Sequence, residues 1–336
     1  MNSVYTQPWK IGLKEALHGC TSIFILADSN LPSKYLNEVV ETCGTNAPIT
    51  THSITGGEQI KTLQEAENLY LELNNVGADR GTVLICLGGG TVTDLGGYVA
   101  SAYKRGIEYV LLPTTLLAMV DAAIGGKTGV NLSTHQGLLK NQIGTFHQPK
   151  FTGLNTMWLE SLSEREIRSG KSEMTKHALL LGDAAYIEQV LDTKNRELPD
   201  LIKKSAQIKQ NIVNQDPHEK GIRAQLNLGH TVAHALETLA AANGEDLRHG
   251  EAVAWGLAFT IKASNIHTGL QNRMTKDINI NLPKAEEMWE VMGSDKKNKS
   301  GNVTDVMLTE TGPVVDFIWN KPEFTKMWED FRKKHA

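Results

Sequence analysis

Short, almost continuously apolar runs alternate with helical patterns over the first 150 residues, and this alternation constrains the fold more than any other feature. Such runs occupy residues 22–27, 82–87 and 109–112, with a weaker one near 49–54, and a helical pattern covers 62–75. A strand that is apolar on both faces must be buried on both faces, which is typical of a parallel sheet covered by helices. The pattern therefore predicts an α/β domain whose ligands gather at the carboxyl ends of the strands.

The second half of the chain has a different character. From about Ser161 the periodicity is helical, and residues 223–239 and 250–264 have the pattern of amphipathic helices. We therefore expect a mainly α-helical C-terminal domain. The expected domains are residues 1–152 and 153–336.

Composition excludes several classes of protein. The net charge of −4 provides no basic field for nucleic acid or an anionic membrane, and no run approaches the ~18 apolar residues of a membrane span. No signal peptide is recognisable. The cysteines Cys20, Cys43 and Cys86 are scattered without a CxxC pair, which indicates a reducing compartment. We expect a cytoplasmic protein without nucleic-acid or membrane partners.

A glycine-rich segment, LGGGTVTDLGG at Leu87–Gly97, follows a predicted strand and opens a predicted helix. Glycines there let backbone amides approach a phosphate, and a helix N-terminus favours an anion. The alternative is a tight strand-to-helix turn without a ligand. Polar residues at two other strand ends, residues 28–30 and 57–61, favour a dinucleotide laid across the sheet edge.

Three segments of the second half carry candidate metal ligands. His230 and His234 share one face of a predicted helix, at i and i+4. His249 opens the next helical segment. Glu173 lies three residues before Lys176 on a third helical segment. Glu173, His230 and His249, drawn from three helices, would form a catalytic metal site with an open position. This donor set suits zinc, although iron, cobalt and manganese are compatible. Alternatively, these histidines are core or surface residues.

Cations gather near the glycine-rich segments and the candidate metal ligands although the chain is net acidic. Lys127 and Lys140 lie within a glycine- and amide-rich stretch at residues 121–150, which we interpret as an anion-binding loop. Arg105 precedes a predicted strand, and Lys209 and Arg223 flank the approach to the histidines. Either these are solvated surface cations, or the substrate carries two anionic groups.

The chain resembles the 3-dehydroquinate synthases, within the sugar-phosphate cyclase superfamily. The resemblance runs from about Asp28 to Lys299, and VDAAIGGKTGVN and the pair GHTVAH and HGEA are its most specific parts. The motifs occur in the family's order: GGGTVTDLGG, YKRG, LPTTLLAMVDAAIGGKTGVN, LLKNQIGTFHQP, SGKSEMTKH, GIRAQLNLGHTVAHALE, LRHGEAV and DKKNKSG.

The resemblance implies a Rossmann-like N-terminal domain, bound NAD, a divalent metal (usually zinc, with cobalt possible) and a homodimer. It implies conversion of 3-deoxy-D-arabino-heptulosonate 7-phosphate to 3-dehydroquinate and phosphate, a step of the shikimate pathway. The reaction combines transient oxidation by NAD, phosphate elimination, reduction and intramolecular aldol closure. The partner would therefore be a small anionic sugar phosphate.

The resemblance also assigns residues position by position. The metal ligands are Glu173, His230 and His249. His234, Lys127, Asn141, Asp121, Lys176 and Arg105 match catalytic positions. The substrate would contact Arg105, Lys127, Asn141, Lys176, Lys209, Arg223, Asn227, His234 and Lys296, or Lys297 in place of Lys296. NAD would contact Asp28, Asn30, Glu58, Lys61, Gly89, Gly90, Asp94, Thr114, Thr115, Asp121, Lys140, Ser161 and Leu162.

Some positions depart from the family pattern. Ala123 stands where many members have Ser, Ala233 replaces a frequent Gly, and the stretch from His234 to His249 is slightly longer than usual. These departures bear on substrate preference. Alternatives are another cyclase, acting on sedoheptulose 7-phosphate or of the 2-deoxy-scyllo-inosose synthase type, a metal-dependent polyol dehydrogenase, or a non-catalytic relative. A non-catalytic relative would lack a ligand or lysine, and none is missing.

Overall fold

The computed structural model describes residues 8–134, 137–193, 198–267, 269–293 and 302–335. The chain forms two compact units. The first comprises Met1–Ile167 and Leu198–Ala206, and the second comprises Arg168–Glu197 and Gln207–Ala336. The domain boundary expected after residue 152 stays a prediction.

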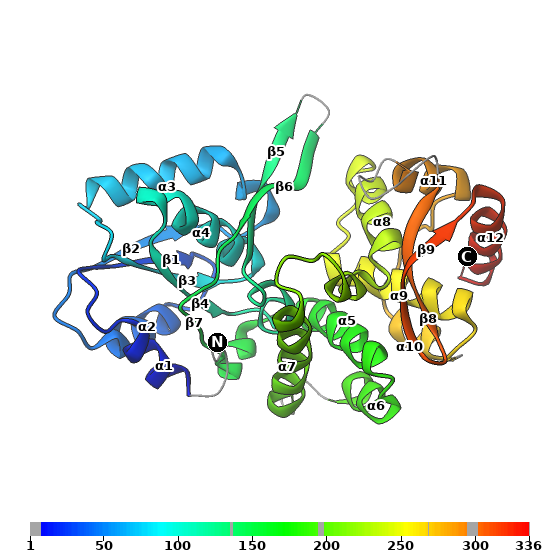
Figure 1. Ribbon diagram of the computed structural model, residues 1–336, viewed down its shortest axis with the longest axis horizontal. Coiled ribbons are helices and arrows are strands. Elements are labelled where there is room, and N and C mark those ends of the chain that lie inside the picture. The colour runs from blue at the N-terminus through cyan, green and yellow to red at the C-terminus, as the bar shows by residue number, and fades with distance from the viewer. Residues whose placement is uncertain (1–7, 135–136, 194–197, 268, 294–301, 336) are drawn as a thin grey trace. The chain divides into compact units, whose positions relative to one another are not determined.

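A five-stranded parallel sheet forms the centre of the first unit, in the order β2-β1-β3-β4-β7 (Figure 1). The strands expected near 22–27, 49–54, 82–87 and 109–112 are all confirmed, and the α/β class with them. Their bounds are β1 Ile23–Asp28, β2 Ile49–Ile54, β3 Val83–Gly88, β4 Glu108–Pro113 and β7 Phe151–Thr152.

Both faces of this sheet are covered, which explains why its strands are apolar throughout. Phe24 and Leu26 of β1 point into one core with α3 and α4, while Ile23 and Ile25 point into the opposite core with α1 and α2. The two helix pairs lie on opposite sides of the sheet (Figure 1). The helices are α1 Trp9–Ala16, α2 Ser33–Cys43, α3 Leu63–Asn75 and α4 Gly90–Ala102.

Helix α4 packs closely on the sheet because it carries Gly96. A Cβ at Gly96 would lie 2.2 Å from Sγ of the buried Cys86 in β3. The absence of a side chain there allows the helix that follows the glycine-rich turn to approach the strand that precedes it. The start of α4 is thereby held at the carboxyl end of β3.

Residues 121–150 do not form the anion-binding loop that the sequence predicted. Most of this stretch is an antiparallel hairpin of β5 (Lys127–Thr134) and β6 (Gly137–Phe146), which projects from the first unit in Figure 1. The prediction of a loop was wrong because glycines and amides were interpreted as loop residues, while the anion contact predicted for this stretch stays a prediction. Here Gly129 and Gly144 face each other, and a Cβ at Gly144 would lie 2.3 Å from the Thr128 carbonyl oxygen.

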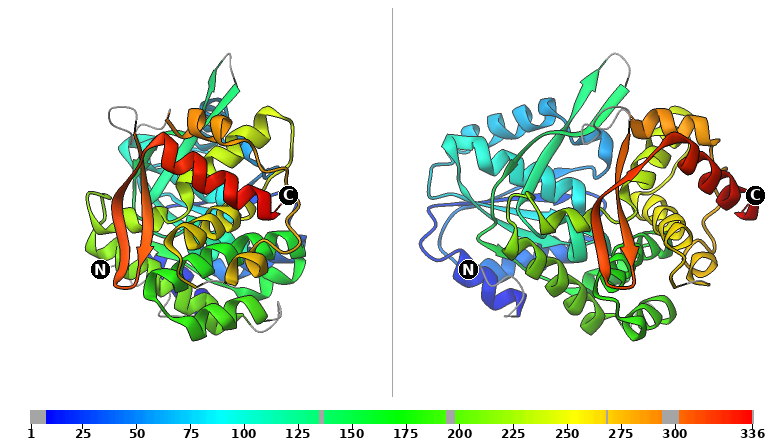
Figure 2. Two further views of the ribbon diagram at one scale, coloured as in Figure 1. Left: turned by 90° about the vertical axis from the view of Figure 1, so that its right-hand side faces the viewer. Right: turned by 45° about the vertical axis from the view of Figure 1, so that its right-hand side comes forward.

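The second unit is mostly helical, as expected, and also contains a hairpin that the sequence did not predict. Strands β8 and β9 pair antiparallel and lie along the helices (Figure 2). The bounds are α5 Glu164–Leu181, which begins in the first unit, α6 Ala184–Asp192, α7 Pro199–Gln215, which also begins in the first unit, α8 His230–Ala242, α9 His249–Ser264, α10 Leu270–Met274, α11 Ala285–Gly293, β8 Val303–Thr309, β9 Gly312–Trp319 and α12 Lys321–His335.

The helix expected over 223–239 is interrupted. A short 3-10 helix, Ile222–Asn227, ends before Gly229, and α8 begins only at His230. Gly229 has a left-handed φ of 74°, and a Cβ there would lie 2.8 Å from the Leu257 backbone nitrogen of α9. The break therefore makes His230 the first residue of α8, against the neighbouring helix. The helix expected over 250–264 is confirmed as α9.

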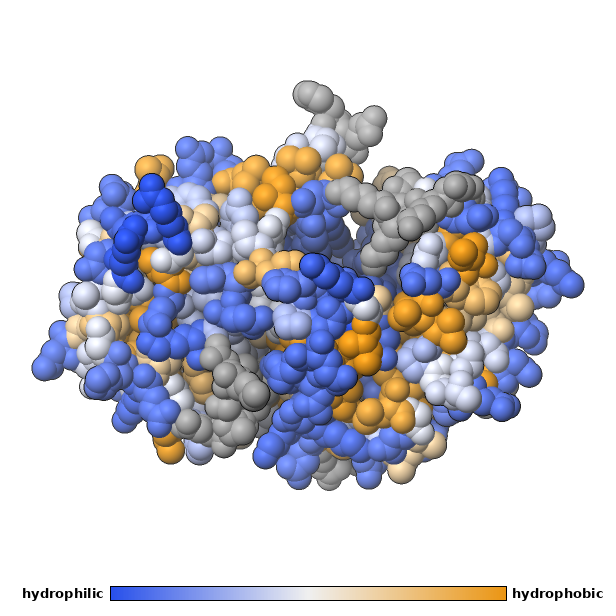
Figure 3. Space-filling model, in the orientation of Figure 1, coloured by the Kyte–Doolittle hydropathy of each residue, from blue (hydrophilic) through white to orange (hydrophobic). Residues whose placement is uncertain are grey.

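Hydrophilic side chains cover much of the face seen in Figure 3, and the hydrophobic ones there form separate groups. No helix in the described part of the chain has the length and apolar character needed to cross a membrane.

Candidate active site

Strands β1 to β4 end at one edge of the sheet, because they are parallel and in register. Asp28 at the end of β1 pairs with Ile54 at the end of β2. Its Oδ1 accepts hydrogen bonds from the backbone nitrogens of Asn30 (3.0 Å) and Gly56 (3.2 Å) and from Nδ2 of Asn30 (3.1 Å). A Cβ at Gly56 would lie 2.2 Å from Oδ2 of Asp28. The predicted nucleotide contacts Asp28 and Asn30 are thus held together at this edge.

The glycine-rich turn occupies the next strand end. Gly88 pairs with Pro113 of β4, and its carbonyl oxygen accepts a hydrogen bond from the Thr114 nitrogen at 3.0 Å. A Cβ at Gly89 would lie 2.9 Å from Cγ2 of Thr115. No side chain caps the N-terminus of α4, which begins at Gly90. Uncapped amides at a helix N-terminus favour a phosphate, so the turn fits the predicted dinucleotide.

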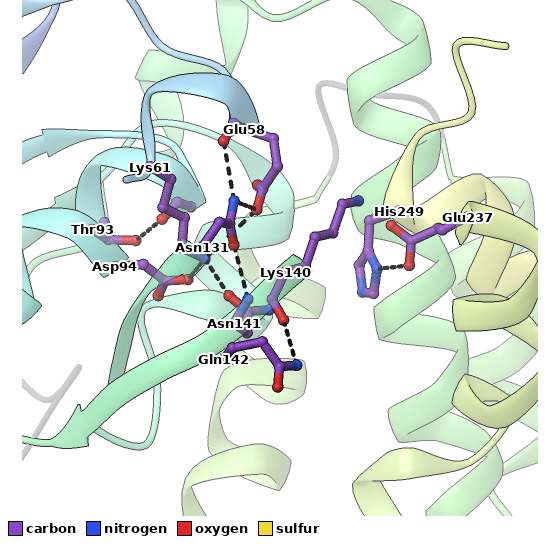
Figure 4. Close-up of polar contacts among 11 residues, drawn as sticks. Glu58, Lys61, Thr93, Asp94, Asn131, Lys140, Asn141, Gln142, Glu237 and His249 are labelled. Atoms are coloured by element: carbon purple, nitrogen blue, oxygen red, sulfur yellow. Dashed lines mark hydrogen bonds and ion pairs between the residues drawn. The ribbon is translucent and has the colours of Figure 1, made fainter. Parts of the chain in front are cut away.

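A buried lysine joins the neighbouring elements (Figure 4). Lys61 is 3% exposed, and its Nζ donates to Oδ2 of Asp94 and to Oδ1 of Asn141, both at 2.6 Å. Oε1 of Glu58 lies 4.0 Å from the same nitrogen. Burial lowers the pKa of Lys61, but the carboxylates of Asp94 and Glu58 outweigh burial and raise that pKa overall. Lys61 therefore stays charged and holds three predicted site residues around it.

The other predicted residues of the first unit lie around the hairpin and after β4. Asp121 is half-buried in a π-helical turn, Ala118–Ala122, a form of helix common at functional sites. Lys127 and Lys140 are exposed on β5 and β6. Arg105 is exposed and has a left-handed φ of 68°, which is uncommon for a residue with a side chain.

Ser161 and Leu162, also predicted to contact NAD, lie at the end of a 3-10 helix, Thr156–Ser161. Oγ of Ser161 donates to the Trp158 carbonyl oxygen at 3.2 Å.

The second unit brings the three predicted metal ligands together. One ligand atom from each of Glu173, His230 and His249 lies within 4.8 Å of the others. Nε2 of each histidine is 3.5 Å from the same oxygen, Oε1 of Glu173. Glu173 is fully buried, and Oε1 has no hydrogen-bond donor among the described residues. A buried carboxylate oxygen without a donor, facing two imidazoles, fits a divalent cation.

Both imidazoles are oriented by their other ring nitrogen. Nδ1 of His230 lies 3.1 Å from the Leu228 carbonyl oxygen, and Nδ1 of His249 lies 3.2 Å from Oε2 of Glu237. A carbonyl oxygen can only accept, so Nδ1 of His230 donates and its Nε2 keeps a lone pair. The Glu237 carboxylate, also seen in Figure 4, orients the His249 ring through Nδ1, which leaves Nε2 to face Glu173. Carboxylates and carbonyls behind ligating histidines are usual in metal sites.

Burial and charge set the protonation of the three groups. Burial disfavours the ionised Glu173, but Lys176 and the two histidines outweigh it and hold the pKa of Glu173 well below its usual range. Burial, and then Lys176, holds the pKa of His230 well below its ordinary value. Burial also lowers the pKa of His249, but the carboxylates of Glu173 and Glu237, which face its two ring nitrogens, raise it to about 10. A metal bound here would displace the His249 proton.

Cations and polar groups predicted to bind substrate share the second unit with this cluster. Lys176 is 1% exposed and forms an ion pair with Oε2 of Glu173. Lys209 and Arg223 are buried, and Nη1 of Arg223 donates to the Pro217 carbonyl oxygen at 2.7 Å. Nδ2 of Asn227 donates to Oε1 of Glu219 at 3.1 Å. Lys296 and Lys297 lie outside the described residues.

His234 stands beside the metal-ligand cluster. Its ring centroid is 5.5 Å from that of His230 and 6.5 Å from that of His249, and its side chain is exposed. It does not belong to the ligand group formed by the described residues. This position agrees with the expectation that His234 is a catalytic residue and no ligand, and that role stays a prediction.

Two residues of the site were missed from the sequence. Glu237 follows His230 by seven residues and therefore shares its face of α8, a spacing that could have revealed it. Asn131 stands in the VDAAIGGKTGVN motif and is 1% exposed, with its side chain hydrogen-bonded to Glu58 and Asn141. Only the hairpin brings Asn131 to those residues, and no pattern of residues indicated that pairing.

Solved structures share the fold of this chain. The chain shares its fold with a 2-deoxy-scyllo-inosose synthase complexed with carbaglucose-6-phosphate, NAD+ and Co2+ (TM-score 0.82, 23% identity, 96% of this chain and 94% of that one). It also shares its fold with 2-epi-5-epi-valiolone synthase from Streptomyces hygroscopicus with NAD+ and Zn2+ bound (TM-score 0.78, 23% identity, 99% and 97%). The chain therefore has the fold of these two synthases.

Sequence comparison identifies the family of the chain. The model of the 3-dehydroquinate synthase N-terminal domain matches residues 51–169, and that of the C-terminal domain matches residues 170–298. Curated 3-dehydroquinate synthases match at 33–38% identity. That of Leptospira interrogans is 38% identical over 325 residues, covering 91% of this chain and 88% of the relative. The chain belongs to the 3-dehydroquinate synthase family, and the predicted resemblance is confirmed.

Proposed function

We propose that this protein converts 3-deoxy-D-arabino-heptulosonate 7-phosphate to 3-dehydroquinate and phosphate, with NAD and a divalent metal as cofactors. The reaction is redox-neutral overall, because the hydride removed early in the turnover is returned later. The observation that carries the proposal is the cluster of Glu173, His230 and His249 with Lys176 buried beside it, in a chain of this family. This cluster combines metal ligands with a cation for an anionic substrate.

When bound, the metal would supply a Lewis acid that lowers the pKa of a substrate hydroxyl, and NAD a reversible hydride acceptor. Glu173, His230 and His249 would hold the metal. Zinc and cobalt both fit this donor set, and related cyclases were solved with NAD+ together with Co2+ or Zn2+.

We assign nucleotide binding to the first unit. The edge formed by Asp28, Asn30 and Glu58 would bind ribose hydroxyls, and the glycine turn before α4 would bind the pyrophosphate. The remaining assigned contacts are Lys61, Gly89, Gly90, Asp94, Thr114, Thr115, Asp121, Lys140, Ser161 and Leu162. Correspondingly, we propose residues 1–152 as the NAD-binding domain and 153–336 as the metal- and substrate-binding domain.

The chain's own cations would bind and orient the substrate. Lys176, Lys209 and Arg223 are buried, so a phosphate or carboxylate would interact with them in a medium of low dielectric constant, where such contacts are strong. Arg105, Lys127, Asn141, Asn227 and Lys296 would complete the anion contacts. His234 would move protons, because its exposed imidazole lies beside the ligand group without belonging to it.

The experiment that tests the function is phosphate release from the heptulosonate phosphate. We expect release that a chelator abolishes and that zinc or cobalt restores, with no net accumulation of NADH. Sedoheptulose 7-phosphate and glucose 6-phosphate, which lack the carboxylate, serve as comparison substrates. Turnover of either one without turnover of the heptulosonate phosphate would refute the proposal in favour of another cyclase activity. Steady NADH formation from a simple polyol would indicate a dehydrogenase.

The metal ligands are tested separately by Glu173→Ala and Glu173→Gln. We expect both variants to lose bound metal and activity, because both remove the anionic ligand; the Gln variant keeps the side-chain volume. Glu164→Gln changes the same charge at an exposed position of the same helix and should retain both. Full metal content in the Gln variant, measured by elemental analysis, would contradict the ligand assignment.

The homodimer and the cytoplasmic location stay predictions.

A further inference from the structure

Asn131 is a buried polar residue without a predicted role, although its side chain and its backbone nitrogen are all hydrogen-bonded. Its Nδ2 donates to Glu58 twice, to the carbonyl oxygen at 3.1 Å and to Oε1 at 2.7 Å. Its Oδ1 accepts from the Asn141 backbone nitrogen at 2.8 Å. Its own backbone nitrogen donates to the Lys61 carbonyl oxygen at 2.7 Å. Asn131 thus contacts three residues assigned to the site (Figure 4).

An irregularity in the hairpin makes these contacts possible. Val130 pairs with Ile143, but Leu132 pairs with Leu139, so Asn131 faces residues 140–142 at a bulge. Asn141 in this bulge has a left-handed φ of 53°. The Asn131 side chain supplies the acceptor for the Asn141 nitrogen inside the bulge. Bulges of this kind re-aim side chains, and here Oδ1 of Asn141 reaches Nζ of Lys61.

The contacts form a closed ring of polar groups. Asn131 holds the backbone of Asn141, the Asn141 side chain holds Lys61, and the Lys61 carbonyl oxygen returns to the Asn131 nitrogen. Lys61 also reaches Asp94 of α4, and Asn131 also reaches Glu58. Asn131 and Lys61 are 1% and 3% exposed, so these two members of the ring are shielded from water, whereas Asn141 is exposed. Buried polar groups whose hydrogen bonds are satisfied are rigid, and here the two buried members hold the exposed one.

We propose that Asn131 is a positioning residue, which fixes Glu58 and Lys61 for the dinucleotide and Asn141 for the substrate as one rigid group. The assignment of those three residues to the two ligands rests on the proposed function. Asparagine suits this position because it offers donors to the two Glu58 oxygens and an acceptor to Asn141 in one side chain. Aspartate would keep the acceptor but set a second carboxylate against Glu58, and leucine would offer neither.

The test measures NAD affinity of the full-length, zinc-loaded protein by titration calorimetry, together with kcat and the KM for NAD. We expect N131L to weaken NAD binding by about tenfold or more, the effect of losing one or two hydrogen bonds. At saturating NAD its kcat should also fall, because Asn141 is displaced. N131D, which keeps the side-chain volume, should also lose NAD affinity. It provides the test if N131L does not fold.

A control from the same hairpin separates positioning from stability. The hydroxyls of Thr128 and Thr145 lie 2.7 Å apart, and T145V removes that contact without touching Asn131. T145V should lower Tm while leaving NAD affinity unchanged. If N131L and N131D likewise lower Tm but bind NAD as the wild type does, Asn131 is merely structural and the inference is overturned.

Pairing N131D with E58Q adds a readout that a structural role would not move. A glutamine at position 58 can donate to the new carboxylate, so the aspartate should cost less NAD affinity in E58Q than in the wild type. An equal cost in both backgrounds would overturn the inference. The proposed function fails by a different measurement, because a wild type that binds NAD but releases no phosphate would refute it. The NAD affinities of the variants would still decide the role of Asn131.

Discussion

Removing the carboxylate of Glu237 is expected to weaken metal binding, although Glu237 is not a ligand itself. Its side chain is 8% exposed, and Oε2 accepts from Nδ1 of His249 at 3.2 Å. Without this acceptor the imidazole of His249 loses its preferred tautomer and orientation. Residues behind a ligating histidine typically contribute 10- to 100-fold to metal affinity, about 1.4–2.8 kcal/mol. We therefore expect E237A to bind zinc about 10- to 100-fold more weakly.

Proton competition changes this loss with pH. Burial lowers the pKa of His249, but Glu173 and Glu237 raise it to about 10, so at neutral pH the metal must displace a proton. E237A lowers this pKa and weakens that competition, which partly offsets the lost orientation. The loss of affinity should therefore be smaller at neutral pH and approach its full value as the pH rises toward 10. E237Q, which keeps an uncharged acceptor, should lie between E237A and the wild type.

The assay is competition for zinc with a chromophoric chelator, at neutral and at alkaline pH, with thermal unfolding as a check of the fold. E329Q is the matched control, because Glu329 is a carboxylate of α12 in the same unit whose contacts are Ala285 and Arg332. Its zinc affinity should equal that of the wild type. Wild-type zinc affinity in E237A throughout the pH range would refute the orienting role.

Two further predictions concern the first unit. K61M should lower the free energy of unfolding by about 2–3 kcal/mol. This is less than the roughly 3–5 kcal/mol typical of a fully buried pair, because the Asp94 side chain is 21% exposed. The pKa of Lys61 is raised in the folded state, so the difference in free energy of unfolding between K61M and the wild type should be constant around neutral pH and shrink only above pH 10.5. Urea titrations measure this difference, and equal stability of the two proteins at neutral pH would contradict the prediction. G96A should destabilise the protein by about 1–3 kcal/mol despite the better helix propensity of alanine, because its Cβ would meet Cys86. G293A is its control, because a Cβ there would meet no atom of the described residues within 4 Å. Equal unfolding midpoints for the two variants would contradict the close approach of α4.

The parallel sheet was predictable because its physics is local. Each strand is buried on both faces, so β1 and β3 appear in the sequence as uninterrupted apolar runs. The grouping of Glu173, His230 and His249 was predictable as well, since each ligand stands in a short segment of its own with helical spacing around it.

The hairpin and its contacts were not predictable in the same way. In β5 the burial pattern is continuous from Thr128 to Asn131, so alternation gives no strand signal, and the contacts of Asn131 depend on a bulge opposite residues 140–142. The break before α8 was missed because apolar periodicity continues through it, whereas the left-handed Gly229 decides it. Features set by non-local pairing or a single backbone angle leave little trace in periodicity.

The buried cations of the second unit suit the anionic substrate of the proposed function. Lys176, Lys209 and Arg223 are all at least nine-tenths buried in a chain whose net charge is −4. Removing each charge from water costs several kcal/mol, which only opposite charge or good hydrogen bonds repay. Glu173 balances Lys176, and a divalent metal on Glu173 would make the group more positive still. A neutral polyol would add no counter-charge to these side chains, whereas a phosphate and a carboxylate on one small molecule would add two.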